Sequence, residues 1–208
     1  MLILQVDPHD PRPAQLAQAV AILAGGGVIA YPTDTVYGLA ADPRNAAAID
    51  RLFEAKSRDR GVAVPLIAGS IEQAFAVGAF TDADVRLARA FWPGPLSIIV
   101  PASRIISAGV LGPDATVALR VPAHAAARAL ALAFGCAITA TSANQSGTAP
   151  ASTAEAAAAA LAGRIDGVLD AGAAPGGAPS TIVQLTPDGP RLVRAGAIAW
   201  ERVLKFIQ

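Results

Sequence analysis

Short apolar runs typical of β-strands alternate along this chain with segments that have the 3.6-residue periodicity of amphipathic helices. A helical segment separates some of these runs, whereas only a short turn separates others. The clearest turn is 187–190 (PDGP), which lies between the runs 181–185 and 191–194. Strands joined through helices run parallel and strands joined by tight turns run antiparallel. The alternation therefore predicts an α/β fold with a twisted, mixed sheet flanked by helices.

The expected elements cover most of the chain. The predicted strands are 2–6, 28–31, 64–68, 96–100, 116–121, 137–141, 181–185 and 191–194. The predicted helices are 13–24, a segment that Asn45 caps and that reaches Lys56, 71–76, 82–91, 123–134, 153–162 and a last one that ends near Phe206. The stretch 171–179 is rich in Ala, Gly and Pro, but it is short and further strand pattern follows it. We therefore expect a loop within one domain that covers residues 1–208.

Composition excludes several classes of protein. Hydrophobic residues make up 53% of the chain and aromatic residues only 5%, so we expect an ample core built from Ala, Val, Leu and Ile. The single cysteine, Cys136, cannot form an internal disulfide, and with only two histidines the chain cannot build a zinc site from these residues. No apolar run approaches the roughly 18–20 residues of a membrane span, and the N-terminus lacks the basic region of a signal peptide. We therefore expect a cytoplasmic protein without membrane contact.

Charge and missing signatures narrow the function further. The 16 basic and 16 acidic side chains give a net charge of zero, which argues against bulk electrostatic binding of nucleic acid but allows a local basic pocket. The signatures GxxxxGK[ST], GxGxxG and GxSxG are absent from the sequence. A catalytic triad would have to use His9 or His124, and neither has a partner pattern, so we do not favour one.

Polar residues gather where strands are expected to end. They form the segments 32–39 (PTDTVYGL), 56–60 (KSRDR) and 140–147 (ATSANQSG), together with Arg120 and Arg194. Each has a plain structural explanation in a turn, a helix end or an arginine paired with a structural carboxylate. Ligands of open α/β sheets bind beyond the carboxyl ends of strands, and Lys and Arg suit phosphate. Together the segments predict a pocket for an anionic, phosphate-bearing ligand and a small polar one.

Seven segments in order give the chain a specific resemblance. They are PTDTVYGL (32–39), KSR (56–58), WPGPLSIIV (92–100), ALRVPAH (118–124), ATSANQSG (140–147), PSTIV (179–183) and RAG (194–196). In these segments the chain resembles the YrdC-like threonylcarbamoyl-AMP synthases. The resemblance implies a single YrdC-like α/β domain with a basic concave face.

The resemblance also implies a reaction. A nucleotidyltransferase of this family makes L-threonylcarbamoyladenylate and pyrophosphate from L-threonine, bicarbonate or CO2, and ATP, with Mg²⁺ accompanying the nucleotide. The product serves the formation of N6-threonylcarbamoyladenosine (t6A37) in tRNA through transferase partner proteins, and contact with tRNA itself is possible. The scheme needs no side-chain nucleophile, so catalysis would consist of positioning and charge stabilisation.

The matching positions imply two sets of site residues. The expected ATP-binding residues are Lys56, Arg58, Thr116, Asn144, Ser152 and Arg194, with Lys56 and Arg58 as the charge-stabilising catalytic pair. The expected threonine-binding residues are Thr35, Arg120, Ser142 and Ser180. No side chain is expected to bind a metal directly.

The segment after the KSR motif departs from the family pattern. Asp59 stands where many relatives have proline, Val64 where they have asparagine, and Gly69 where some have a histidine that contacts threonine. These changes leave the threonine contacts of the segment 59–69 open. Arg60 has no counterpart and could either contact phosphate or pair with Asp59.

Some alternatives stay open. Asp34 could act on a proton or only orient its loop. The chain ends at Gln208 and so resembles the short form of the family without an additional C-terminal domain. An RNA-binding module of the same fold, without adenylate synthesis, is the main competing function, although no aromatic stacking platform is present. A related carbamoyl-transfer domain of hydrogenase maturation is a weaker competitor.

Overall fold

Two mixed sheets, of five and six strands, form the framework of the computed structural model, which describes residues 1–207. The first sheet has the order β1 (Leu2–Gln5), β9 (Gly167–Asp170), β2 (Ile29–Tyr31), β3 (Gly38–Ala40) and β8 (Thr141–Ser142). The second has the order β11 (Gly189–Arg194), β10 (Thr181–Thr186), β5 (Leu96–Pro101), β6 (Thr116–Arg120), β4 (Leu66–Ile67) and β7 (Ile138–Thr139). Both sheets contain parallel and antiparallel pairs, which confirms the predicted α/β class and its mixed strand directions. The strands are divided between two sheets, where the sequence led us to expect one.

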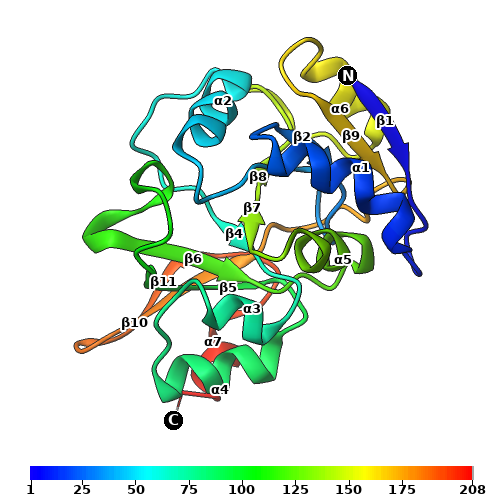
Figure 1. Cartoon of the computed structure of the whole chain (residues 1–208). Coiled ribbons are helices and arrows are strands. Elements are labelled where there is room, and N and C mark those ends of the chain that lie inside the picture. Colours follow the sequence, from blue (N-terminus) through cyan, green and yellow to red (C-terminus); the bar gives the residue numbers. More distant parts are fainter. Residues whose placement is uncertain (208) are drawn as a thin grey trace.

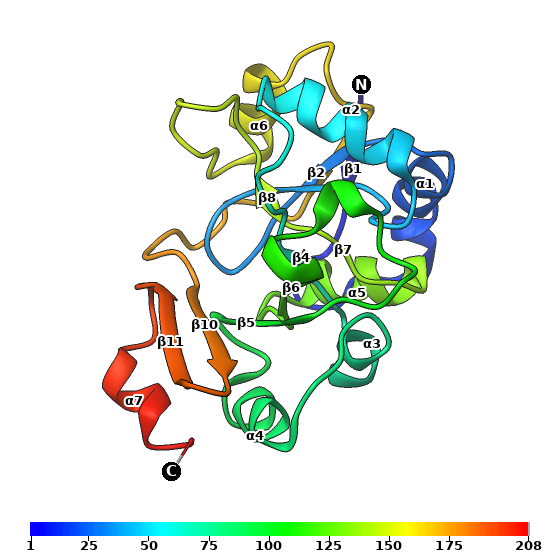
Figure 2. The same cartoon turned by 90° about the vertical axis from the view of Figure 1, so that its left-hand side faces the viewer.

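Helices surround both sheets. They are α1 (Pro13–Ala24), α2 (Ala46–Lys56), α3 (Ile71–Phe75), α4 (Asp82–Phe91), α5 (Ala125–Phe134), α6 (Ala154–Ala160) and α7 (Trp200–Leu204), with short 3-10 turns at Ala108–Val110 and Pro113–Ala115. Helices α1 and α5 lie side by side, and α1 packs against β1, β2 and β9 of the first sheet (Figure 1). Figure 2 shows α4 and α7 at the end of the molecule that holds β10 and β11, and α2 and α6 at the opposite end.

The start of α2 shows how local sequence sets an element boundary. Asn45 caps the helix as expected, because its Oδ1 accepts hydrogen bonds from the backbone N–H groups of Ala47 (3.0 Å) and Ala48 (3.3 Å). The helix ends at Lys56, and Ser57 adopts the left-handed conformation (φ 50°, ψ 47°). This turn redirects the chain between Lys56 and Arg58, which would otherwise point to different sides of the helix.

The predicted strand 137–141 is wrong as a single element. Residues Ile138 and Thr139 form β7 of the second sheet, whereas Thr141 and Ser142 form β8 of the first. The hydroxyl of Thr139 connects the two sheets, because it accepts a hydrogen bond from the Ala41 N–H (2.8 Å) and donates one to the carbonyl of Leu39 (2.8 Å). The chain therefore crosses from one sheet to the other at this point and places β8 beside the predicted ligand site.

Two strands of the first sheet were missed by the sequence analysis. The strand β3 is buried and pairs antiparallel with β2, so the residues 32–37 form the loop of a β-hairpin. The strand β9 lies between β1 and β2 and runs parallel to both. Both strands are buried and only three or four residues long, which gives them no alternation of polar and apolar residues.

Candidate active site

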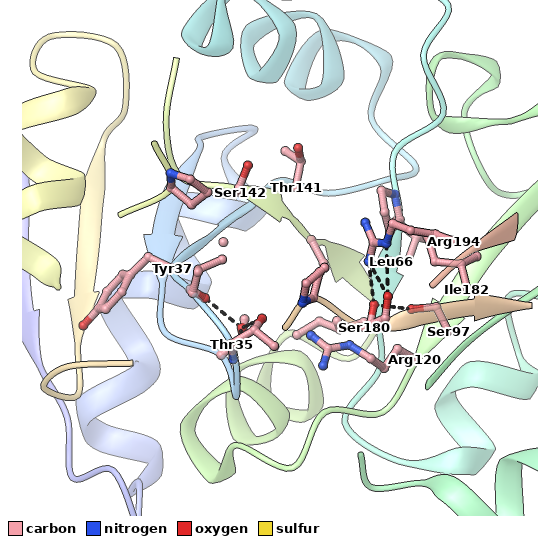
Figure 3. A pocket seen from close by; sticks show the side chains of 18 of the residues that line it. Thr35, Tyr37, Leu66, Ser97, Arg120, Thr141, Ser142, Ser180, Ile182 and Arg194 are labelled. Carbon is pink, nitrogen blue, oxygen red and sulfur yellow. Dashed lines mark hydrogen bonds between the residues drawn. The ribbon is translucent and has the colours of Figure 1, made fainter. Parts of the chain in front are cut away.

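A cavity of about 570 Å³ lies where the two sheets meet. Its walls come from the hairpin loop between β2 and β3, from the strands β4, β5, β6, β8 and β10, and from the end of β11 (Figure 3). Six of the ten predicted site residues line it: Thr35, Arg58, Arg120, Ser142, Ser180 and Arg194. The other four, Lys56, Thr116, Asn144 and Ser152, do not line it. The fold thus brings together predicted site residues up to 159 positions apart, from Thr35 to Arg194.

Arg120 and Asp34 form an ion pair at the edge of the cavity. The Arg120 Nη1 donates to the Asp34 Oδ1 at 2.6 Å, and the two side chains are only 8% and 13% exposed. The other carboxylate oxygen of Asp34 accepts from the backbone N–H of Ala123 at 3.3 Å. The sequence allowed a structural carboxylate or an anionic ligand as the partner of Arg120, and the structure shows a carboxylate, that of Asp34. Asp34 therefore orients the arginine and the hairpin loop.

A network of hydroxyl groups shapes the hairpin loop. Thr33 is 3% exposed, and its Oγ1 donates to the carbonyl of Val36 (2.7 Å) and accepts from the Thr35 N–H (3.2 Å). The Thr35 hydroxyl lies 3.1 Å from the same oxygen. The Gly176 N–H donates to the carbonyl of Thr35 (2.9 Å), which attaches the predicted loop 171–179 to the site. Thr33 was not among the predicted site residues, although it lies in the PTDTVYGL motif.

Two arginines face the cavity without a carboxylate partner in the described chain, residues 1–207. Arg58 makes one long contact, from its Nη1 to the Thr141 Oγ1 at 3.4 Å. Arg194 donates from Nε and Nη2 to the carbonyl of Ser180 (3.0 and 2.7 Å). Burial lowers the pKa of both groups, and the positive charge of Arg120 adds to the effect at Arg194. Guanidinium groups remain charged in spite of such shifts, so the cavity carries positive charge that no neighbouring carboxylate offsets.

Lys56 lies behind the cavity wall. Its Nζ donates to the carbonyls of Ser142 and Asn144, the latter at 3.0 Å, and approaches the Asn144 Oδ1 at 3.4 Å. Three acceptors match the three donors of an ammonium group, so this lysine holds the ATSANQSG segment in place. Burial, and then the charge of Arg58, lower the pKa of Lys56 to about 8.

The remaining predicted residues make contacts outside the cavity wall. Thr116 donates to the carbonyl of Pro113 (2.7 Å) at the start of β6. Asn144 is buried, and its Nδ2 donates to the carbonyls of Gln145 (2.9 Å) and Thr148 (2.6 Å). Ser152 is exposed, and its carbonyl accepts from the Ala174 N–H at 2.8 Å.

The altered segment after Arg58 has a structural explanation. Arg60 pairs with Asp50 on the surface (3.2 Å) and not with Asp59, which corrects one of its two expected roles. At Gly69 an added Cβ would meet the carbonyl oxygen of Arg128 at 2.5 Å, so this position faces helix α5 and has no room for a side chain. The segment reaches the cavity wall instead through Ala63, Pro65, Leu66 and Ile67.

Within residues 1–207 the chain has neither a cluster of metal-binding side chains nor a membrane-spanning helix. Between residues 1 and 207, no three His, Cys, Asp or Glu side chains lie close enough together to hold a metal ion. Over the same residues, no helix is both long and apolar enough to cross a membrane.

The chain matches known proteins over most of its length. A family model described as Sua5, YciO and YrdC, telomere recombination, matches residues 21–196. The threonylcarbamoyl-AMP synthase of Thiobacillus denitrificans is 44% identical over 167 residues, which cover 79% of this chain and 88% of that relative. The structure of P. abyssi Sua5 complexed with L-threonine superposes with a TM-score of 0.92 at 33% identity. That match covers all of this chain, which spans 61% of the P. abyssi protein. E. coli YciO superposes with a TM-score of 0.85 at 27% identity and covers 96% of this chain and 98% of its own.

The fold, the cation-lined cavity and these matches define an α/β nucleotidyltransferase that uses ATP. The chain belongs to the Sua5/YciO/YrdC family of threonylcarbamoyl-AMP synthases. The predicted family, fold and enzyme class are confirmed, and so is the predicted activity, synthesis of threonylcarbamoyl-AMP for t6A modification of tRNA. The P. abyssi relative is the one complexed with L-threonine, and the confirmed activity disfavours an RNA-binding module without catalysis for this chain.

Proposed function

We propose that the cavity holds L-threonine against its hydroxyl-lined wall and the phosphates of ATP against Arg58 and Arg194. The observation that carries the proposal is the presence of two guanidinium groups that face one cavity without a carboxylate partner within residues 1–207. An incoming phosphate supplies the missing negative charge, and guanidinium groups can bind it through two parallel hydrogen bonds.

The threonine wall consists of Thr35, Ser142, Ser180 and Arg120. Asp34 fixes the Arg120 side chain, whose remaining N–H groups can donate to the carboxylate of the amino acid. The three hydroxyl groups suit the ammonium, carboxylate and hydroxyl groups of a small polar amino acid. A pocket of this kind distinguishes threonine from serine by one methyl group, so we expect discrimination of only about 10–200-fold.

The nucleotide side extends past the cavity wall. Lys56 contributes its charge from behind the wall and holds the carbonyls of Ser142 and Asn144 in place. In this proposal Asn144, Thr116 and Ser152 contact parts of the nucleotide that lie beyond the phosphates. Mg²⁺ enters with the nucleotide as part of the substrate, since it keeps several waters and binds readily to phosphate oxygens.

The proposed chemistry needs no protein nucleophile. The neutral amine of threonine attacks the carbon of bicarbonate, and water leaves to give a carbamate. A carbamate oxygen then attacks the α-phosphorus of ATP. The bond from that phosphorus to the bridging oxygen breaks, and pyrophosphate leaves with the electron pair. Arg58 and Arg194 offset the charge that grows on the leaving group, which is the kind of electrostatic stabilisation that lowers barriers most.

The product then passes to a protein that transfers the threonylcarbamoyl group to tRNA. We propose that this transferase is a transient partner, that contact with tRNA occurs at most at the time of transfer, and that the reaction takes place in the cytoplasm. A single domain over residues 1–208 supplies all the site residues in this proposal.

The test is release of pyrophosphate by the purified protein with ATP, Mg²⁺ and bicarbonate, with and without L-threonine. We expect threonine-dependent release, and Arg58→Ala should lose at least ~100-fold in kcat/KM, the scale of removing one charge-stabilising donor. Arg60→Ala is the matched control, since Arg60 lies two residues along the same segment but pairs with Asp50 on the surface. Near wild-type activity in Arg58→Ala, or an equal loss in Arg60→Ala, contradicts the phosphate assignment.

A further inference from the structure

Ser97 is a buried polar residue in the middle of an apolar strand. It lies in β5 between Leu96 and Ile98, which are fully buried, and it is itself 3% exposed. Its side chain lines the cavity, although neither the motifs nor the resemblance assigned it a role. Its one hydrogen-bond partner within residues 1–207 is the hydroxyl of Ser180, at 3.0 Å between the two oxygens.

Ser180 has a second partner in Arg194. The Arg194 Nη2 donates to the Ser180 Oγ at 2.9 Å, while the same guanidinium also holds the Ser180 carbonyl. Figure 3 shows the three side chains in sequence, from Ser97 through Ser180 to Arg194. A guanidinium group has donors only, so the Ser180 oxygen accepts from Arg194.

Either hydroxyl could donate in the hydrogen bond between Ser97 and Ser180, so its direction depends on where the remaining proton can go. Ser97 is less exposed (3%) than Ser180 (8%), and an outward proton on the more accessible hydroxyl finds an acceptor in the cavity more easily. We infer that Ser97 donates to Ser180. Both lone pairs of the Ser180 oxygen are then used, and its own proton is left to donate into the cavity.

The backbone fixes the place of Ser180 independently of Ser97. The Thr181 N–H donates to the carbonyl of Pro95 (3.0 Å), and the Ala197 N–H donates to the carbonyl of Pro179 (2.9 Å). An added Cβ at Gly196 would meet the backbone carbon of Ser180 and the backbone nitrogen of Thr181 at 2.5 Å, so this segment approaches too closely for any side chain. Ser97 therefore orients the hydroxyl proton of Ser180 and does not determine where Ser180 lies.

We propose that Ser97 is a positioning residue that makes Ser180 a fixed hydrogen-bond donor to a carboxylate oxygen of the amino-acid substrate. The inference rests on the proposed function, in which Ser180 contacts threonine. A carboxylate only accepts hydrogen bonds and therefore fits a hydroxyl that can only donate. Because Arg194 is the other partner of Ser180, the threonine side and the nucleotide side of the cavity share this one hydroxyl group.

The experiment compares the KM values of variants for the two substrates. Ser97→Ala frees one lone pair of Ser180, so its proton no longer has a single direction. We expect the KM for threonine to rise about 5–10-fold, with the KM for ATP changed by less than about twofold and kcat largely kept. Ser97→Thr keeps the hydroxyl and should restore most of the threonine affinity.

Thr81→Ala is the control, because it also removes a hydrogen-bonded hydroxyl, but one at the start of α4 that does not line the cavity. It should lower the free energy of unfolding and leave the KM for threonine unchanged. The double variant Ser97→Ala/Ser180→Ala should bind threonine no more weakly than Ser180→Ala alone, since Ser97 acts only through Ser180. Additive effects in the double variant, or an equal rise in both KM values, overturn the inference.

The two proposals fail in different ways. Threonine-dependent turnover by the wild-type protein, with an unchanged KM for threonine in Ser97→Ala, overturns this inference and leaves the proposed function standing. A wild-type protein without threonine-dependent turnover overturns the proposed function and this inference with it.

Discussion

The arginines on the two sides of the cavity have different hydrogen-bond partners. On the threonine side, Arg120 is nearly buried and already paired with Asp34. On the nucleotide side, Arg58 and Arg194 have no carboxylate partner within residues 1–207 and bond only to hydroxyl and carbonyl oxygens. A single cavity therefore contains one arginine whose charge a carboxylate neutralises and two arginines whose charge no carboxylate neutralises.

The difference indicates which ligand each side suits. A paired arginine has little net charge to offer, so it orients a small ligand by the geometry of its remaining donors. An unpaired arginine in a partly buried site gains most from an incoming anion, because no carboxylate competes for it. The triphosphate of ATP carries far more negative charge than an amino acid, which agrees with the proposed division of the cavity.

The largest expected effect comes from removing the paired arginine, Arg120. Arg120→Ala leaves the Asp34 carboxylate nearly buried without its partner, so we expect the free energy of unfolding to fall by about 2–4 kcal/mol, together with a loss of threonine turnover. Arg58→Ala leaves no carboxylate behind, so its free energy of unfolding should change by less than about 1 kcal/mol while its activity falls.

Urea denaturation of both variants, alongside pyrophosphate release, measures the contrast. Equal losses of stability in Arg120→Ala and Arg58→Ala would show that the two arginines stand in the same electrostatic state, contrary to the comparison.

A smaller effect is expected when the carboxylate of the ion pair is replaced and the arginine is kept. Asp34→Asn keeps the shape of the side chain but removes the charge, which makes Arg120 an unpaired cation like Arg58. We expect the free energy of unfolding to fall by about 1–2 kcal/mol and the KM for threonine to rise about 10-fold, because the guanidinium loses its charge-assisted anchor. Asp50→Asn removes the exposed partner of Arg60 and serves as the matched control, with an expected cost below about 1 kcal/mol. Thermal unfolding and threonine saturation curves test both variants.

Much of the fold follows from local sequence. The helices at Pro13–Ala24 and Asp82–Phe91 have their predicted bounds, because proline or a capping threonine marks the start and the apolar stripe is regular. The strand β3, with the sequence Gly-Leu-Ala, has no β-branched residue and only three positions, so only its partners in the sheet reveal it. The crossing at Thr139 depends on hydrogen bonds to Leu39 and Ala41, about a hundred residues away, which no local pattern contains.

The site was predictable where a motif lies at a strand end and less so elsewhere. Arg120 stood out as an arginine in an apolar strand, but its partner Asp34 is 86 positions away and could not be assigned from the sequence. Ser97 and Thr33 were overlooked because a lone serine or threonine in an apolar or turn segment is common, and only the pairing of strands brings Ser97 to Ser180. Lys56 lies in the expected motif, but the left-handed turn at Ser57 sends it behind the wall and Arg58 into the cavity.

The buried lysine on the nucleotide side predicts a pH dependence. Lys56 has a pKa of about 8 in the folded protein, and above that pH it loses both its charge and one of its three donors. The pH profile of kcat/KM for ATP reports the free enzyme, so we expect a decline of roughly 3–10-fold between pH 7.5 and 9.5. Lys56→Arg should move this decline to higher pH, since a guanidinium group keeps its proton.

Stability should change in the opposite direction over the same range. The pKa of Lys56 is lower in the folded state than in the unfolded state, so the unfolded state binds more protons between about pH 8 and pH 10.5. The free energy of unfolding therefore rises with pH in that window, and this gain is lost as the pH falls through 8. Lys205, the chain's other lysine, is exposed, and Lys205→Arg should alter neither profile. Parallel changes of activity and stability with pH would argue against Lys56 as the titrating group.

The smallest expected effect tests how far the nucleotide side extends. Ser152 is exposed and lies outside the cavity wall, and its carbonyl is joined to the loop 171–179 through the Ala174 N–H. One neutral hydrogen bond to the nucleotide contributes about 0.5–1.5 kcal/mol, so Ser152→Ala should raise the KM for ATP by about 2–10-fold and leave the KM for threonine unchanged. Ser146→Ala, at another exposed serine of the same stretch, should leave both values unchanged. A rise beyond 10-fold in Ser152→Ala would mean that the hydroxyl bonds to a charged phosphate oxygen, since hydrogen bonds to charged groups are about twice as strong. In that case the triphosphate would reach past Arg58 and Arg194, and the contrast between the two sides of the cavity would describe only part of the nucleotide site.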